Sequence, residues 1–303
     1  MSVENLWHSL VKVTLWFLAG LPLGWSRWIG SWIGRFNYLL ATRASKVTHE
    51  NLALCFPHFS MEVRKNLARR SLIHTGQTMM ETPAVWLGEV NRVKSWITQV
   101  KNEDLLDVAI ESGKGVIVLL PHVGNWEMFN VYFSTKGRMT ALYQPPRQEF
   151  LKPVMQEVRS NFGNDLVPTT VKGISRLYRS LEQGNVVTVL PDQVPLNGEY
   201  CPFFGQLALT DVLVSRLIKK TGAVAISCIV VRQKSGFQVC FKEVNTKIYS
   251  KELSESLQGL NSSIEASVQD HLEQYQWEYK RFRERPGGQK KLYKFKGQPD
   301  VYH

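Results

Sequence analysis

The run from Gly113 to Glu127, GKGVIVLLPHVGNWE, decides the fold. It holds a glycine-bounded block of five apolar residues, VIVLL at 116–120, and the chain then turns at Pro121. A short, uninterrupted apolar block between turn residues is typical of a strand that is buried on both faces. The residues that follow are predicted to start a helix. The run therefore predicts a strand-to-helix unit with His122 at the junction.

Further strands and helices alternate on the C-terminal side of this run. Strands are predicted at 138–143, 165–168, 186–190, 223–231 and 237–244. Helices are predicted at 62–100, with a break at Pro83, and at 126–134, 149–162, 172–183, 210–221 and 251–279. This alternation predicts an α/β fold with a mostly parallel central sheet flanked by helices. In such folds, functional sites gather at the carboxyl ends of the strands.

The N-terminal segment is rich in tryptophan. Five of the nine tryptophans lie in the first 32 residues, and fourteen uncharged residues separate Lys12 from Arg27. A membrane span needs roughly 20 apolar residues, whereas tryptophan favours the headgroup boundary. Residues 1–45 are therefore predicted to form a membrane-anchoring helical segment, spanning the bilayer or lying in its interface, ahead of one α/β domain over 46–303. The basic residues that follow are expected to place this domain on the cytoplasmic side of the membrane. An ordinary buried helix is the alternative.

The chain is basic, with 37 Lys and Arg residues against 26 Asp and Glu residues and a net charge of +11. The C-terminal segment 278–296 carries eight basic and two acidic residues, interleaved with aromatic residues. This pattern suits anionic lipid headgroups, phosphorylated sugars or single-stranded nucleic acid, and a solvated tail is the alternative. No nucleic-acid-binding motif is present, so we expect an anionic membrane and no nucleic acid as partner. The four cysteines have no metal-ligand spacing, and no metal is expected.

A histidine and a carboxylate stand five residues apart at the end of the first strand. Glu127 is predicted to return to the Nδ1–H of His122, which would leave Nε2 free to act as a base. Gly124 would let the backbone bend tightly between them. The alternative is a structural histidine. The sequence contains no P-loop, no G-x-S-x-G elbow and no G-x-G-x-x-G, so a hydroxyl group of the substrate, or water, is the expected nucleophile.

Four sequence blocks resemble those of one family. The stretch LLPHVGNWE resembles the first motif of the lysophospholipid-acyltransferase superfamily, and more narrowly of the late acyltransferases of lipid A biosynthesis. A second block begins at Tyr143, where Gln144 replaces the usual arginine and Arg147 is expected to compensate. The third block is PDQVPLNGEYCPFFGQLALT at 191–210, and the fourth is HLEQYQWEYKRFRERP at 271–286.

The resemblance implies an activity and further site residues. It implies transfer of a fatty acyl chain from acyl carrier protein to a hydroxyl group of an acyl chain on the phosphorylated, Kdo-bearing lipid A precursor, without a cofactor. His122 would be the base and Glu127 its partner. Arg159 would stabilise the oxyanion, Asp192 would order the site, and Tyr143 and Arg147 would contact substrate. Another glycolipid or a glycerophospholipid as acceptor, and a thioesterase with the same residues, remain alternatives.

Overall fold

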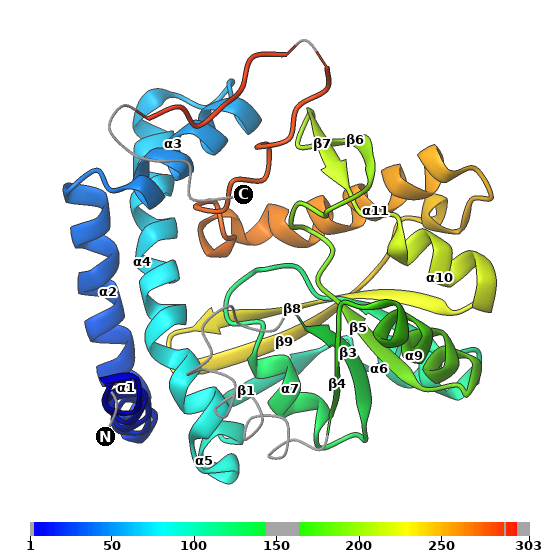
Figure 1. Ribbon diagram of the computed structural model, residues 1–303, viewed down its shortest axis with the longest axis horizontal. Coiled ribbons are helices and arrows are strands. Elements are labelled where there is room, and N and C mark those ends of the chain that lie inside the picture. Colours follow the sequence, from blue (N-terminus) through cyan, green and yellow to red (C-terminus); the bar gives the residue numbers. More distant parts are fainter. Residues whose placement is uncertain (1–2, 144–163, 288, 296–303) are drawn as a thin grey trace.

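The computed structural model of the 303-residue chain describes residues 3–143, 164–287 and 289–295 (Figure 1). A seven-stranded sheet forms its centre, in the order β1-β9-β8-β2-β5-β3-β4. The strands are β1 (Ile97–Lys101), β2 (Val116–Leu119), β3 (Met139–Tyr143), β4 (Asp165–Pro168), β5 (Val186–Val189), β8 (Val224–Gln233) and β9 (Gly236–Glu243). Every neighbouring pair is parallel except β8 and β9. The predicted α/β fold with a mostly parallel sheet is confirmed.

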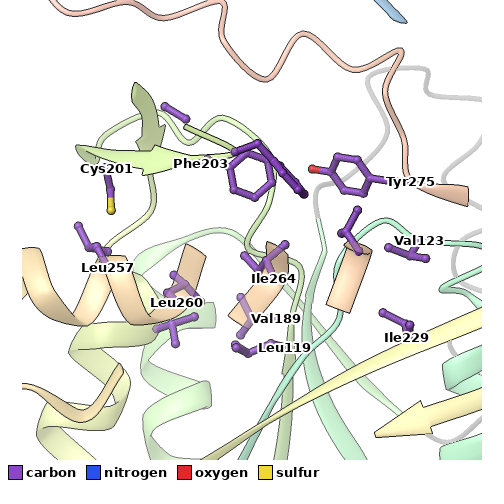
Figure 2. Close-up of a cluster of buried hydrophobic side chains, with 14 of the residues drawn as sticks. Leu119, Val123, Val189, Cys201, Phe203, Ile229, Leu257, Leu260, Ile264 and Tyr275 are labelled. Carbon is purple, nitrogen blue, oxygen red and sulfur yellow. The ribbon is translucent and has the colours of Figure 1, made fainter. Parts of the chain in front are cut away.

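Helices cover both faces of the sheet. The helices are α1 (Val3–Gly20), α2 (Leu23–Leu39), α3 (Arg43–Cys55), α4 (Met61–Leu87), α5 (Val90–Lys94), α6 (Glu103–Glu111), α7 (Met128–Phe133), α9 (Val171–Glu182), α10 (Leu213–Thr221) and α11 (Leu253–Val268). Side chains alternate between the two faces of a strand. Val116 and Val118 of β2 accordingly pack with α6 and α7, whereas Ile117 and Leu119 pack with α9, α10 and α11. Figure 2 shows the second of these clusters.

A two-stranded antiparallel hairpin of β6 (Glu199–Phe203) and β7 (Gln206–Thr210) lies above this second cluster. Phe204 at its turn adopts a positive φ of 46°, and its backbone N–H donates to Oε1 of Glu265 at 2.7 Å. Phe203 and Phe204 are buried in the cluster beside Trp277. The paired phenylalanines of the third sequence block are therefore core residues.

Three helix predictions need correction. The helix predicted over 62–100 ends at Leu87 and is followed by α5 and by β1, a half-exposed edge strand without an alternating pattern. Pro83 does not break α4, which continues to Leu87 before Gly88 caps it. The helix predicted to reach residue 279 ends at Val268, with a 3-10 turn at Gln269–Gln274, an isolated bridge from Tyr275 to Val123 and a further turn after it. The helix predicted at 149–162 lies outside the described residues.

The N-terminal segment forms two helices that separate at Pro22. Gly30 and Gly34 of α2 lie against the backbone of α4, where a Cβ on Gly34 would come within 2.2 Å of the Leu72 carbonyl oxygen. Within residues 3–143, 164–287 and 289–295, no helix is long and apolar enough to cross a bilayer. A spanning anchor is therefore unsupported, and one face of α2 is buried against α4 (Figure 1).

Candidate active site

The site lies where β2 and β5 end. His122 follows β2 and Asp192 follows β5, and because these strands are parallel neighbours, both residues stand at the same edge of the sheet. The two side chains are buried. Nδ1 of His122 lies 2.8 Å from Oδ1 of Asp192, and the backbone N–H of His122 donates to Oδ2 at 2.9 Å. Both carboxylate oxygens of Asp192 are therefore committed to the same histidine.

This pairing fixes the protonation pattern of the imidazole. A carboxylate accepts from Nδ1–H, which leaves Nε2 as the acceptor nitrogen. The amide Nε2 of Gln193 lies 3.1 Å from that nitrogen and also donates to Oε1 of Gln276 at 3.2 Å. Burial would raise the pKa of Asp192, but the charge and hydrogen bonds of His122 hold the pKa below its ordinary value. Asp192 is thus an anion beside a histidine whose Nε2 can accept a proton.

Glu127 does not occupy the predicted position on Nδ1, since Asp192 holds that nitrogen. Glu127 instead precedes α7 at the N-cap position, where its side chain makes no capping hydrogen bond, and Nδ2 of Asn130 donates to its Oε2 at 3.3 Å. Burial raises the pKa of Glu127, and polar neighbours, His122 among them, act in the opposite direction. Glu127 nevertheless lines the same cavity as His122. Its place in the chemistry stays a prediction.

The backbone around Gly124 holds the histidine loop in place. Gly124 has a φ of +63°, and a Cβ there would lie 2.0 Å from the carbonyl oxygen of Val230. Its N–H donates to the Gln274 carbonyl at 2.8 Å, and the N–H of Gln276 donates to the His122 carbonyl at 3.1 Å. The tight bend expected at Gly124 is confirmed, and the loop is held between β8 and the segment that follows α11.

A cavity of about 470 Å³ opens beside His122. Apolar side chains line it together with threonine, glutamine and glutamate side chains. The lining residues are Leu15, Thr75, Thr78, Met79, Thr82, Pro83, Trp86, His122, Gly124, Trp126, Glu127, Gln274, Gln276 and Glu278. The ring of Trp126 lies edge-on to the imidazole, with 4.5 Å between centroids. A largely apolar cavity with a few converging polar groups is typical of a site for a small or chain-like ligand.

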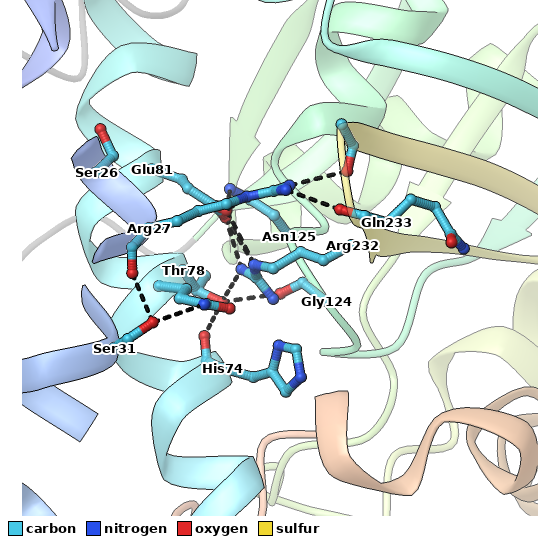
Figure 3. Close-up of polar contacts among 12 residues, drawn as sticks. Ser26, Arg27, Ser31, His74, Thr78, Glu81, Gly124, Asn125, Arg232 and Gln233 are labelled. Atoms are coloured by element: carbon cyan, nitrogen blue, oxygen red, sulfur yellow. Dashed lines mark hydrogen bonds and ion pairs between the residues drawn. The ribbon is translucent and has the colours of Figure 1, made fainter. Parts of the chain in front are cut away.

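A buried cluster of charged side chains contacts the loop that carries His122 (Figure 3). The carboxylate of Glu81 on α4 accepts from Nε of Arg27 at 2.8 Å and pairs with NH2 of Arg232 at 2.7 Å. It also accepts from Nδ2 of Asn125 at 3.2 Å. Thr78 donates to the Gly124 carbonyl at 2.9 Å. Glu81 therefore links α2, α4, β8 and the histidine loop.

The remaining predicted residues divide in two. Tyr143 ends β3 and so lies at the same edge of the sheet as His122, since β3 pairs with β5. Arg147 and Arg159 lie outside the described residues.

Residues 274–278 supply Gln276 and Glu278, which the sequence analysis did not assign to the site. Among residues 3–143, 164–287 and 289–295, no three His, Cys, Asp or Glu side chains converge as metal ligands.

This fold and site fit one class of enzyme. A buried His–Asp pair that leaves Nε2 toward a cavity, at the carboxyl end of a mostly parallel sheet, suits base-assisted attack by a hydroxyl group. Residues 2–284 match the family model for bacterial lipid A biosynthesis acyltransferases, so the chain belongs to this family. The resemblance of the four sequence blocks is confirmed. The protein is an acyltransferase of the lipid A biosynthesis type.

Individual relatives support this assignment. The chain is 27% identical over 288 residues to the lipid A biosynthesis palmitoleoyltransferase of Escherichia coli (strain K12), with 92% of each chain covered. It is 23% identical over 279 residues to the lipid A biosynthesis lauroyltransferase of the same organism, with 90% of each chain covered. It is also 28% identical over 145 residues to the phosphatidylinositol mannoside acyltransferase of Mycobacterium tuberculosis (strain CDC 1551 / Oshkosh), with 45% of each chain covered.

Proposed function

We propose that the protein transfers a fatty acyl chain directly from acyl carrier protein to a hydroxyl group of an acyl chain on the Kdo-bearing lipid A precursor. The observation that carries this proposal is His122, whose Nδ1 is held by Asp192 and which lines a largely apolar cavity in a member of the lipid A acyltransferase family. The relatives that match over about nine-tenths of the chain bear lipid A acyltransferase names. The sequence contains no recognisable enzyme nucleophile motif, which favours direct transfer.

The chemistry follows from the two nitrogens of His122. The acceptor hydroxyl displaces the amide of Gln193 from Nε2, and Nε2 takes its proton as the oxygen attacks the thioester carbonyl carbon. Asp192 stabilises the imidazolium that forms. When the tetrahedral intermediate collapses, the C–S bond breaks and the imidazolium gives its proton to the departing thiolate. Glu127 adds a second carboxyl group to the cavity, and Arg159, Tyr143 and Arg147 keep the substrate roles that the resemblance implies.

Transfer to a defined acceptor tests the proposal. Purified protein is incubated with acyl carrier protein thioester, with and without Kdo-bearing lipid A precursor, and products are identified by mass spectrometry. We expect an acyl ester on the precursor with the wild-type protein and at least a 10³-fold lower rate with His122→Ala, because the base is lost. Release of free fatty acid at the same rate without acceptor would instead identify a thioesterase.

A second acceptor class follows from the mannoside relatives. The match to phosphatidylinositol mannoside acyltransferases covers 45% of the chain and supports a glycolipid other than the lipid A precursor as an alternative acceptor. Parallel assays with the lipid A precursor, a phosphatidylinositol mannoside and a lysophospholipid separate these possibilities. Esterification of the mannoside or the lysophospholipid alone would contradict the lipid A proposal.

We further propose that α1 and α2 lie in the interface of an anionic inner membrane, with the sheet on its cytoplasmic side. The face of α2 away from α4 exposes Trp25, Trp28, Trp32 and Phe36, with exposed fractions of 61%, 58%, 42% and 54%. Tryptophan at this density favours the headgroup region. The net charge of +11 favours anionic lipid.

Flotation with phosphatidylglycerol vesicles tests this placement. Replacing Trp25, Trp28 and Trp32 together with serine should reduce the vesicle-bound fraction severalfold, because three amphipathic rings are lost. Val171→Ser is the matched control, since this side chain is 86% exposed on α9, away from α2. Unchanged flotation of the triple variant would contradict the interfacial placement of α2.

A further inference from the structure

The segment after α11 forms one wall of the cavity. Gln274, Gln276 and Glu278 line the cavity, whereas the intervening Tyr275 and Trp277 are buried in the core. Gln274 ends the 3-10 turn, and the chain turns again at Trp277 and Glu278, where the N–H of Tyr279 donates to the Gln276 carbonyl at 3.2 Å. Backbone hydrogen bonds to His122 and Gly124, given above, hold the segment in place. The side-chain amide of Gln274 pairs with the backbone of Arg232, so Gln276 and Glu278 are the polar side chains of this wall that a ligand can meet.

Glu278 is the member of this wall whose hydrogen bonding is incomplete. Its Oε2 is buried, yet this oxygen makes no hydrogen bond with any group among residues 3–143, 164–287 and 289–295. A buried carboxyl oxygen without a partner is unfavourable and calls for an explanation. Since the side chain lines the same cavity as His122, the missing partner is expected to be a group of the bound substrate.

The surroundings of Glu278 favour its neutral form. Burial raises its pKa to about 7, and contacts with Thr75, Gln276 and His122 only partly offset this rise. The titratable groups that face the cavity are His122 and Glu127 from the histidine loop, while α1 and α4 contribute apolar side chains and threonines. No lysine or arginine is among the described lining residues. A neutral carboxyl group carries one O–H donor.

We propose that Glu278 contacts the reacting acyl group and donates a hydrogen bond from its protonated carboxyl group to the thioester carbonyl oxygen. This inference rests on the proposed acyl transfer. As the acceptor oxygen bonds to the carbonyl carbon, the C=O electron pair moves onto that oxygen, which Glu278 stabilises while keeping its proton. The C–S bond then breaks, and the imidazolium of His122 supplies the proton that the thiolate takes. A carboxylic acid kept neutral by an apolar site is suited to this role.

Two substitutions distinguish a donor from an acceptor. Glu278→Gln keeps the shape and an N–H donor but cannot titrate, whereas Glu278→Ala removes the donor. We expect kcat of the wild type to fall as pH rises above about 7, because the donor is lost on ionisation. Glu278→Gln should retain activity within about tenfold and lack this fall, and Glu278→Ala should lose about 10²–10³-fold at every pH. An arginine donor such as Arg159 would give no such titration.

Controls make each outcome decisive. Glu273→Gln changes a carboxylate five residues earlier that pairs with Arg70 on the surface, and its kcat should equal that of the wild type. If Glu278→Gln is as inactive as Glu278→Ala while remaining folded, the donor role is overturned. Full activity of Glu278→Ala overturns any contact with the reacting group. His122→Ala in the same assay reports on the proposed transfer itself, whatever the Glu278 variants do.

A spectroscopic measurement reads Glu278 without turnover. The infrared carbonyl band of protonated carboxyl groups is recorded for the wild type, Glu278→Gln and Glu127→Gln across pH 5–8. We expect the wild type to retain a protonated carboxyl near pH 7 that is missing from Glu278→Gln and present in Glu127→Gln. Absence of a difference between the wild type and Glu278→Gln would overturn the protonated donor even if no acceptor substrate were turned over.

Discussion

Two buried carboxylates hold the histidine loop, one at each end. Asp192 binds both Nδ1 and the backbone N–H of His122. Glu81 binds Asn125, three residues on, and is shared between two arginines. The partner of Asp192 can gain and lose a proton, whereas the arginine partners of Glu81 stay charged. In the mechanism proposed above, the buried carboxylate of Asp192 therefore takes part in the chemistry, whereas the equally buried carboxylate of Glu81 positions the loop.

The largest expected effect is a loss of activity on substitution of Asp192, which binds the His122 end of the loop. Asp192→Asn keeps the size of the side chain but removes the charge that would stabilise the imidazolium, and it replaces one of the two oxygens that bind His122 with an NH2 donor. We expect kcat to fall about 10³–10⁴-fold with little change in melting temperature. The matched control is Asp165→Asn, at the start of β4 on the opposite edge of the sheet. If Asp192→Asn retains more than a tenth of the activity, the His–Asp pair is not the reactive unit.

The second effect is a loss of stability on substitution of Glu81, which binds the Asn125 end of the loop. Glu81→Gln leaves Arg232 buried beside a neutral side chain, because the side chain of Glu81 is 0% exposed and that of Arg232 is 3% exposed. Loss of one partner of a buried pair costs about 3–5 kcal/mol of unfolding free energy. Urea unfolding measures this loss. Glu62→Gln, an exposed glutamate at the start of α4, should cost less than about 1 kcal/mol. Equal stability of the two variants would show that the cluster does not hold the loop.

The third effect is a dependence of stability on pH that comes from Glu278. Its pKa is raised from 4.5 to about 7, so the folded state binds the proton more tightly than the unfolded state does. The resulting stabilisation is complete below pH 4.5 and is lost as pH rises to about 7, by up to roughly 3 kcal/mol. Urea unfolding of Glu278→Gln between pH 4.5 and 7.5 should lack this decline, and a decline as steep as that of the wild type would contradict it.

The smallest effect sharpens the role of α2. Arg27 donates to Glu81 and to the backbone carbonyls of Gln233 and Gly236, each at 2.8 Å. Lysine cannot reproduce this fork, so Arg27→Lys should cost about 1–2 kcal/mol in urea unfolding. Arg35 lies on the same helix over the ring of Trp32. Arg35→Lys is the control, and we expect it to lower the free energy of unfolding by less than about 0.5 kcal/mol. A larger cost for Arg35→Lys would reverse this assignment.

The central strands could be predicted because their signal is local. The short runs at 116–120 and 186–190 are predominantly apolar and predict buried strands without knowledge of any distant residue. β2 and β5 lie inside them. β1 was missed because an edge strand with mixed exposure has no clear pattern. The hairpin of β6 and β7 was missed because its fourth residue is a proline and its strands are short.

The site was predictable in part for the same reason. His122 and the bend at Gly124 follow from the sequence around the strand end. The partner of Nδ1 does not, because Asp192 is 70 residues away and is brought there by the pairing of β2 with β5. The sequence therefore predicts Glu127 as the partner of Nδ1, whereas the partner in the structure is Asp192. Gln276 and Glu278 lie in a stretch whose mixed polar and apolar residues are also compatible with the end of a helix, so the sequence does not single them out.

The two sides of α2 have a joint consequence. One side is closed against α4 through Gly30 and Gly34 and carries Arg27 into the Glu81 cluster, and the other displays the tryptophans. Any surface that receives the tryptophans thus stands at a constant height from the imidazole of His122. With the proposed interfacial placement of α2 and the proposed acyl transfer, we expect an acceptor hydroxyl to be selected by its depth in the membrane as well as by its chemistry.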